Sequence, residues 1–252
     1  MARTSQLQTR FHRIVTAGVL AVAALWASGF ADPPRAFIIG AFSHVAPGTL
    51  PAGWATMPLG NTPRSTYATV EKNGITVVQA HADDSASGLV RRITIDPHDF
   101  PVLEWRWRAE GVLESGDVRK RRGDDYPARI YITFDYDPSN LSTSEWLKYR
   151  AAQALTAHDI PLRALSYIWS NEQRDDVPVP NPFTNWVMMV PVEGGQENVG
   201  RWVVERRNIV EDYRRAFGED PPAITGIALM TDADNTGESV TAYYGDLVLR
   251  SE

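Results

Sequence analysis

Short runs in which hydrophobic and polar residues alternate dominate the sequence after its first thirty residues. Alternation with a period of two is typical of β-strands that bury one face, and turns rich in Pro and Gly separate the runs. Nine runs predict strands over residues 37–44, 75–81, 89–95, 102–108, 129–136, 186–192, 201–207, 224–230 and 240–249. So many short strands, without helices alternating between them, predict a mainly β fold, an antiparallel β-sandwich of the jelly-roll type.

Two segments carry helical signals instead and predict short helical insertions. Ser142 and Glu145 have the spacing of a capping box. The apolar residues that follow on one helical face are Leu147, Ala151, Ala154 and Leu155. We expect this helix to pack over or beside a sheet.

The second helical segment begins at Asn208 and Glu211, which resemble the same start signal. Ile209, Tyr213 and Phe217 then form an apolar stripe. Gly218 supplies the left-handed residue that typically ends a helix.

Residues 1–31 have the pattern of a secretory signal peptide. Three arginines and no acidic residue form the positive start, residues 14–26 are apolar, and Gly29 and Ala31 precede a cleavage position. The alternative is a membrane anchor that stays uncleaved, although the apolar run is shorter than the roughly 20 residues of a typical span. Both alternatives predict export, to the periplasm or the medium.

Composition narrows the class of protein further. The chain has 25 basic and 31 acidic residues, and loss of the three N-terminal arginines leaves 22 and 31, a net charge of −9. This balance disfavours nonspecific nucleic-acid binding. The absence of cysteine excludes disulfides, thiol nucleophiles and Cys-ligated metals. No linker or repeat divides residues 32–252, so we expect a single domain there.

Several motifs carry a resemblance to a known family. They are LEWRWR (103–108), GDDYPARIYITF (123–134), YIW (167–169), DYRRAFG (212–218), DADNTG (232–237) and YGDLVL (244–249). In this order they resemble the domain-of-unknown-function family 3047 of exported bacterial proteins. That family offers no activity or catalytic residues to carry over. The strand-rich ending is also similar in architecture to jelly-roll carbohydrate-binding modules, although a fold does not establish a function.

Alternation places polar side chains together on one face of two predicted strands. Strand 102–108 turns Trp105 and Trp107 to its apolar face, and strand 129–136 does the same with Ile130 and Ile132. The opposite faces carry Glu104, Arg106, Arg108, Arg129, Tyr131 and Asp135. If the strands are neighbours, these residues form one continuous surface suited to sugar hydroxyls and acid groups. The alternative is a solvated face held by cross-strand ion pairs.

The loop before the second of these strands adds charged candidates. In the sequence RKRRGDD (119–125), the basic residues can clamp an anionic glycan, and Asp124 and Asp125 can act as an acid/base pair. The alternative is a solvated loop. Trp169 is a further ligand-binding candidate if its indole is exposed, because exposed indoles stack on sugar rings, whereas a buried one fills the core.

The motif DADNTG is the only candidate metal loop, and calcium the only candidate cofactor. The EF-hand template fails at Thr236 and Tyr243, so Asp232 and Asp234 would need Asp246 or Glu238 to complete the ligand shell. The alternative is that the Asp and Asn side chains cap a turn between two strands.

From these observations we expect an exported envelope protein that binds an oligosaccharide or a similar polar ligand on a concave sheet face without turnover. One alternative is a glycan hydrolase or lyase that uses the acidic residues near 124–135. Another is an envelope scaffold protein in which the same face binds a protein. A serine hydrolase is disfavoured because the sequence contains no G-x-S-x-G motif.

Overall fold

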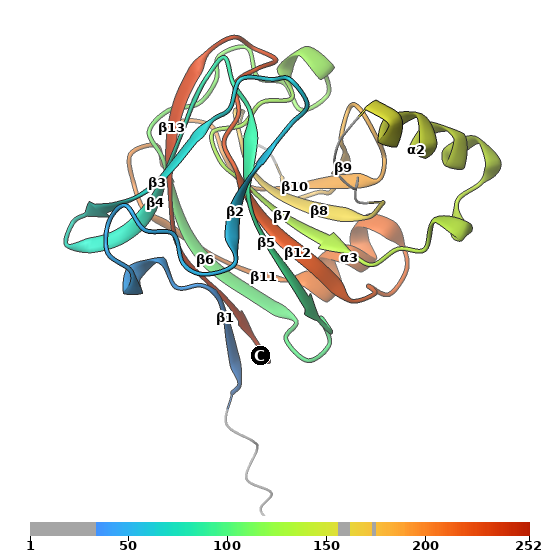
Figure 1. Cartoon of the computed structure of the whole chain (residues 1–252), viewed down its shortest axis with the longest axis horizontal. Helices are drawn as coiled ribbons and strands as arrows, with labels where there is room; N and C mark the ends of the chain where they lie inside the picture. Colours follow the sequence, from blue (N-terminus) through green and yellow to red (C-terminus); the bar gives the residue numbers. More distant parts are fainter. Residues whose placement is uncertain (1–33, 156–161, 173–174) are drawn as a thin grey trace, which may run out of the picture. The chain divides into compact units, whose positions relative to one another are not determined.

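The computed structural model describes residues 34–155, 162–172 and 175–252 (Figure 1). The signal peptide expected over residues 1–31 lies outside the described residues. Residues 35–252 form one compact unit. Within the described ranges, no helix has the length and apolar character needed to cross a membrane.

The first sheet, sheet A, contains six strands in the order β11-β6-β13-β4-β3, and β1 pairs with β13 off this path. Its strands are β1 (Ala36–Gly40), β3 (Thr66–Lys72), β4 (Ile75–Asp83), β6 (Val102–Ala109), β11 (Val203–Asn208) and β13 (Ser239–Arg250). All of these pairings are antiparallel.

The second sheet, sheet B, contains seven strands in the order β2-β5-β12-β7-β8-β10-β9. Its strands are β2 (Trp54–Pro58), β5 (Ser87–Ile95), β7 (Arg129–Phe134), β8 (Ala164–Ser170), β9 (Val179–Pro180), β10 (Val187–Gly194) and β12 (Ile224–Met230). β8 and β10 run parallel, which differs from the expected antiparallel arrangement. The chain between β8 and β10 contains β9, which runs antiparallel to β10. The chain therefore returns along β9 before β10 begins, and β10 starts at the same end of the sheet as β8.

The expected mainly β sandwich is confirmed, and each of the nine predicted runs contains a strand. The run over 37–44 ends early, because Phe42–His44 form a 3-10 turn, η1. The alternation pattern misses β8, since all seven of its residues are buried and no polar face remains to alternate with.

Aromatic side chains fill the space between the sheets. Trp105 and Trp107 on β6 meet Tyr167 and Trp169 on β8. Trp105 stacks on Tyr167 with ring centroids 5.2 Å apart, and the centroids of Trp107 and Trp169 are 5.9 Å apart. These four buried rings fix the distance between the sheets and form the centre of the core.

Helix α3 (Ile209–Phe217) forms as its sequence predicts. The Asn208 side chain accepts the backbone N–H groups of Val210 and Glu211, each at 3.1 Å. The helix ends at Gly218 with a φ of 75°, in the left-handed region that favours glycine. Ile209 and other apolar residues of α3 pack into the core, so the helix joins the ends of the two sheets.

Helix α2 (Thr143–Leu155) has the expected capping box: Ser142 N–H donates to the Glu145 carboxylate at 3.0 Å, and Glu145 N–H to Ser142 Oγ at 3.4 Å. Its apolar face differs from the expectation, because Leu147 is 65% exposed. The half-buried face instead contains Tyr149, whose ring lies 5.9 Å from that of Trp186. The side chains of Ala151, Ala154 and Leu155 lie outside the described part of the structure. Two short 3-10 turns, η2 (Arg121–Gly123) and η3 (Pro138–Asn140), precede α2.

Candidate functional site

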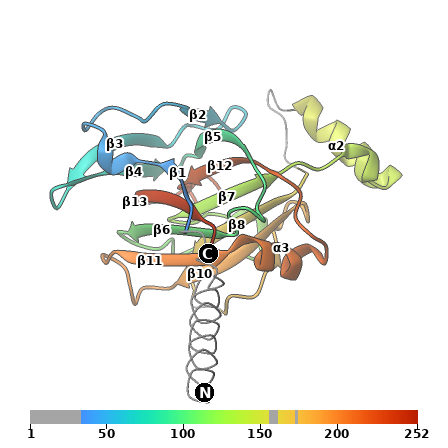
Figure 2. The same cartoon turned by 90° about the horizontal axis from the view of Figure 1, so that it is seen from below.

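The two strands with polar faces, β6 and β7, do not lie side by side, because β6 belongs to sheet A and β7 to sheet B (Figure 2). Both strands turn apolar residues into the core, so their polar faces point to opposite sides of the sandwich. The expectation of one continuous polar surface is therefore wrong. Alternation fixes which side chains of a strand share a face, but it carries no information about the sheet in which the strand pairs.

Arg129 begins β7 and lies at the centre of a buried ionic cluster rather than on an open surface. Its Nε donates to Asp232 Oδ1 at 2.9 Å, and its Nη2 also bonds the Asp232 carboxylate. Its Nη1 lies 3.4 Å from Asp124 Oδ1 and donates to Tyr131 Oη at 3.1 Å. Burial raises the pKa of Asp124, against the opposing charge of Arg129. The cluster attaches loop segments to the outer face of sheet B.

Asp125, the neighbour of Asp124, closes the loop that follows β12. Its carboxylate accepts four hydrogen bonds, from the backbone N–H and side chain of Asn235 and from the backbone N–H and hydroxyl of Thr236, at 2.7 to 3.0 Å. Asp125 is fully buried. A carboxylate held by four donors in this way is a structural cap and is not open to a substrate.

The candidate calcium ligands do not come together as the sequence suggests. Asp246 instead binds Ser43, whose backbone N–H and hydroxyl donate at 2.8 and 2.5 Å. Asp125 takes its place beside Asp232 and Asp234, with one oxygen of each within 4.8 Å of the others. The donor set does not fit a cation, because Asp232 already binds the Arg129 guanidinium and Asp125 its four donors. The expected capping of this turn by its own Asp and Asn side chains is not what holds the loop, since Asp125 accepts the backbone N–H groups of Asn235 and Thr236.

The remaining predicted residues of sheet B are scattered. Tyr131 is half-buried beside Arg129, whereas Asp135 follows the far end of β7, about 20 Å along the strand direction. Trp169 is fully buried in the core and donates its indole N–H to the Gly195 carbonyl at 3.2 Å. Its expected contact with a ligand is therefore ruled out by burial.

The outer face of sheet A is the polar surface that remains. Glu104, Arg106 and Arg108 point out of β6, and all three are half-buried. Neither α2 nor α3 covers this face (Figure 2). Three of the nine predicted ligand-binding residues therefore share an accessible face.

Two aromatic rings lie among these polar residues. The Arg106 guanidinium carbon is 4.8 Å from the centroid of Trp202, and the Trp202 and Tyr243 rings are 6.5 Å apart. Lys72 Nζ lies 3.6 Å from the centre of the Tyr243 ring, and Gln79 Nε2 donates to Tyr243 Oη at 3.0 Å. We call Lys72, Arg106, Trp202 and Tyr243 the aromatic–cation cluster.

Arg106 differs from the other charged residues of this face. Arg108 forms a bidentate ion pair with Glu110 at 3.0 Å, and Arg250 forms one with Glu104 at 2.9 and 3.1 Å. The guanidinium of Arg106 lies against the Trp202 ring, and no hydrogen bond satisfies it among the described residues. Its five N–H donors therefore remain open to solvent or to a ligand.

Gly245 on β13 gives Arg106 its position. A side-chain carbon at residue 245 would lie 2.5 Å from Arg106 Cγ and 2.6 Å from its Nε, closer than any real contact. The glycine falls where the pairing of β6 and β13 shifts its register, between Tyr244 and Leu247. The Arg106 side chain can therefore lie flat across β13.

Sequence reasoning missed Lys72, Gln79, Trp202 and Tyr243 as members of this surface. The only signal for Tyr243 is alternation: its neighbour Tyr244 is buried in the core, which turns Tyr243 outward. Lys72 on β3 and Gln79 on β4 precede Trp202 and Tyr243 by more than 100 residues in sequence. Only the pairings of β3 with β4 and of β4 with β13 bring them to this surface.

A carboxylate with a perturbed pKa lies at the edge strand β11. Glu205 pairs with Trp105 across β11 and β6, and its Oε1 is buried without a hydrogen-bond partner in the described residues. Burial, followed by the negative charge of Glu193, raises the pKa of Glu205 from 4.5 to about 7. Glu193 itself accepts the Asn198 side-chain amide at 3.0 Å.

Two solved structures are similar to this chain at low sequence identity. The family 11 carbohydrate-binding module of a Clostridium thermocellum cellulosomal cellulase is 10% identical, with a TM-score of 0.42 over 85% of this chain and 94% of that one. A family 29 carbohydrate-binding module complexed with mannohexaose is also 10% identical, with a TM-score of 0.38 over 87% and 93%. No curated protein matches the sequence.

The sequence profile of one protein family matches residues 52–248, which is most of the chain. The match runs from β2 into β13 and includes the strands of sheet A other than β1. It thereby confirms the family resemblance carried by the six sequence motifs. The chain belongs to the family of proteins of unknown function designated DUF3047.

Proposed function

We propose that this protein is exported and binds an acidic oligosaccharide on the outer face of sheet A, without turnover. Export is inferred from the signal-like residues 1–31. Binding is inferred from the aromatic–cation cluster and the charged residues beside it, and not from the similarity to other folds.

The observation that carries the proposal is the position of Arg106. Its guanidinium is held against an indole, lies over Gly245 and makes no hydrogen bond with a described residue, on a face that neither α2 nor α3 covers. A planar guanidinium binds carboxylates in bidentate fashion, and an adjacent indole offers an apolar surface to a sugar ring. Trp202 and Arg106 together can therefore recognise both parts of an acidic sugar.

The charge of this surface favours an anionic ligand. Among the described residues, five cations lie on or beside β6, and the ion pairs that three of them form there involve two carboxylates, Glu104 and Glu110. The cations are Lys72, Arg106, Arg108, Arg206 and Arg250. The chain as a whole carries a net charge of −6, so this face is a local reversal of sign. Such a reversal attracts an anion while the rest of the surface repels it.

Binding without turnover is inferred from the state of the carboxylates on the outer face of sheet A. A glycosidase needs one carboxylic acid with a raised pKa to protonate the leaving group. The hydrogen bond from Arg250 lowers the pKa of Glu104, and the hydrogen bond from Arg108 lowers that of Glu110. Both groups are therefore anions at neutral pH. The expected acid/base pair, Asp124 and Asp125, is buried in other interactions on the opposite side of the sandwich.

Titration calorimetry with oligogalacturonate and with a neutral galactose oligomer of equal length tests the proposal. We expect the acidic oligomer to bind more tightly, and Arg106→Gln and Trp202→Ala each to weaken binding by about tenfold or more. Arg92→Gln is the matched control, since Arg92 is exposed on β5 in sheet B.

Three results would contradict the proposal. They are an equal affinity of wild type and Arg106→Gln, an equal loss in Arg92→Gln, and the release of shortened oligosaccharides during the titration. The last result would support the hydrolase or lyase alternative. A protein partner that is retained by the wild type and lost in Arg106→Gln, without saccharide binding, would support the scaffold alternative.

A further inference from the structure

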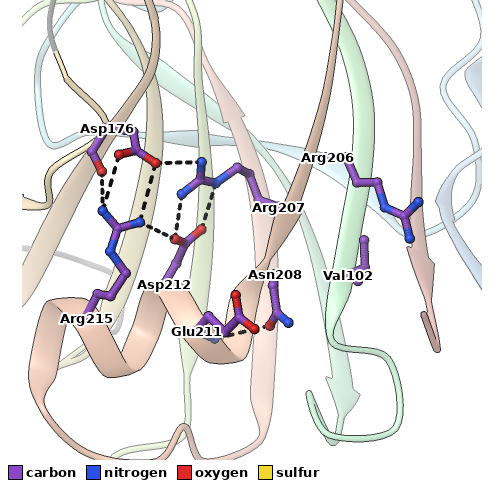
Figure 3. A pocket seen from close by; sticks show the side chains of 8 residues that line it. All are labelled: Val102, Asp176, Arg206, Arg207, Asn208, Glu211, Asp212 and Arg215. Atoms are coloured by element: carbon purple, nitrogen blue, oxygen red, sulfur yellow. Dashed lines mark hydrogen bonds and ion pairs between the residues drawn. The ribbon is translucent and has the colours of Figure 1, made fainter.

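A shallow pocket of about 440 Å³ opens where β11 meets α3, away from the aromatic–cation cluster (Figure 3). Its lining is strongly charged and combines β11, α3 and the loop after β8. The lining residues are Val102, Asp176, Arg206, Arg207, Asn208, Glu211, Asp212 and Arg215.

Arg207 is rigidly positioned at the wall of this pocket. Its Nε and Nη2 bind the two oxygens of Asp212 at 2.9 and 2.6 Å. Asp212 is buried and also accepts the hydroxyl of Tyr167 at 2.9 Å. This arrangement fixes two of the three guanidinium nitrogens and leaves Nη1 free to bind a group in the pocket.

The group that Nη1 binds is a carboxylate of the protein itself. Asp176 Oδ2 lies 3.0 Å from Arg207 Nη1, and both of its oxygens lie 3.3 to 3.4 Å from Arg215. Arg215 also donates to the Asp176 carbonyl at 2.9 Å. Hydrogen bonds from Arg215 and Arg207 lower the pKa of Asp176, which keeps it ionised. Its side chain is nevertheless 50% exposed.

Arg207 and Arg215 would form an anion site even without Asp176. Without the Asp176 charge, two guanidinium groups would face a single carboxylate, Asp212, and one positive charge would be unbalanced (Figure 3). Glu211 lies beside Asn208 on the other side of the pocket, and Arg206 points away from the group (Figure 3). An external carboxylate can therefore compete with a half-exposed internal one.

We propose that this pocket binds a small sugar acid, whose carboxylate takes the place of Asp176 between Arg207 and Arg215. The volume is far larger than one carboxylate needs and lies in the range of small-molecule sites. The side-chain nitrogen of Asn208 and the carboxylate of Glu211 line the remaining space and can bind sugar hydroxyls. The proposal does not rest on the function proposed for sheet A, since the pocket contains no residue of the aromatic–cation cluster, and Arg206, the one cation common to both surfaces, points away from Arg207 and Arg215.

The probe is galacturonate, and galactose, which lacks the carboxylate, is the neutral control ligand. Asp176→Asn removes the internal competitor, so we expect it to bind galacturonate about threefold or more tightly than the wild type. Arg215→Gln removes one of the two donors and should weaken binding by a similar or larger factor. Arg215 is half-exposed, and the buried Asp212 keeps its two hydrogen bonds from Arg207 in this variant.

The chain offers matched controls for both variants. Arg214 and Asp220 form an exposed ion pair outside the pocket lining, so Arg214→Gln and Asp220→Asn make the same charge changes elsewhere. We expect both controls to bind galacturonate as the wild type does. A second titration uses oligogalacturonate. If the natural ligand is a free sugar acid, galacturonate should bind at least as tightly as the oligomer. If the natural ligand is the end of a chain, only the oligomer should bind.

The proposal is overturned if Asp176→Asn and Asp220→Asn change galacturonate binding equally, or if galactose binds as well as galacturonate. It is also overturned if none of the variants binds galacturonate, since Asp176→Asn should expose the site. Loss of oligomer binding in Arg106→Gln with unchanged galacturonate binding would confirm that the two sites are separate. Binding of galacturonate by Asp176→Asn alone would support an internal carboxylate that blocks the site.

Discussion

Arg129 and Asp232, which are 103 residues apart in sequence, form a bidentate ion pair whose side chains are only 2% and 1% exposed. Arg129 also contacts Asp124, so three segments of the chain meet at one guanidinium. The pair joins the segment before β7 to the loop after β12. It holds these segments on the outer face of sheet B, and for that reason this face is not an open polar surface.

Loss of the Asp232 charge should destabilise the protein strongly. Asp232→Asn would leave Arg129 buried with only the more distant Asp124, and breaking a buried pair costs about 3–5 kcal/mol. Urea denaturation of wild type and variant measures the free energy of unfolding. The exposed pair of Asp220 and Arg214 provides the control, and Asp220→Asn should cost less than about 1 kcal/mol. Equal effects of the two substitutions would show that the buried pair has no special structural role.

Glu205 should make the stability depend on pH. Its pKa is about 7 in the folded protein and near 4.5 when unfolded, so the folded state binds more protons between these values. Stability should therefore fall as the pH rises from about 4.5 to 7, and level off above that. Glu205→Gln keeps a neutral side chain at every pH and should remove this fall.

The measurement compares unfolding free energies at pH 5 and pH 8. At each pH, the unfolding free energy of Glu205→Gln is compared with that of the wild type. We expect this difference to favour the variant by roughly 1–3 kcal/mol more at pH 8 than at pH 5. Glu71→Gln is the control, because Glu71 is exposed on β3. A difference that is the same at both pH values would mean that Glu205 is solvated in the folded state.

The two helices should respond differently to substitution of their apolar residues. Leu147 on α2 is 65% exposed, so Leu147→Ser should change the unfolding free energy by less than about 0.5 kcal/mol. Ile209 on α3 is fully buried, so Ile209→Ala should cost about 2–5 kcal/mol. Thermal unfolding of both variants checks this contrast. A large loss in Leu147→Ser would show that α2 packs through its expected apolar stripe.

Local chemistry in the sequence predicted much of the secondary structure. The capping residues Ser142 and Asn208 and the left-handed Gly218 act through neighbours within a few residues, so the sequence suffices to place the start of each helix and the end of α3. Trp105 and Trp107 likewise follow from alternation, which turns them to the core wherever β6 pairs. By contrast, β8 is buried on both faces and gives no alternating pattern.

The candidate site depended on information that the sequence lacks. Arg106 and Arg129 have the same pattern of polar and apolar neighbours, yet one lies on an open face and the other is buried with Asp232. The difference arises because strand order decides which loops cover which face. The contacts of Asp246 with Ser43 and of Lys72 with Tyr243 also depend on pairings across more than 150 residues.

Short-range periodicity and capping suffice to predict the β-rich class, the start of each helix, the end of α3 and the inward direction of the core tryptophans. The placement of β6 and β7 in opposite sheets, the approach of Trp202 and Tyr243 to Arg106 and the position of Asp176 in the arginine pocket become visible only in the folded chain. Side-chain alternation is a property of one strand, whereas a surface is made by strands and loops that the chain brings together from distant positions.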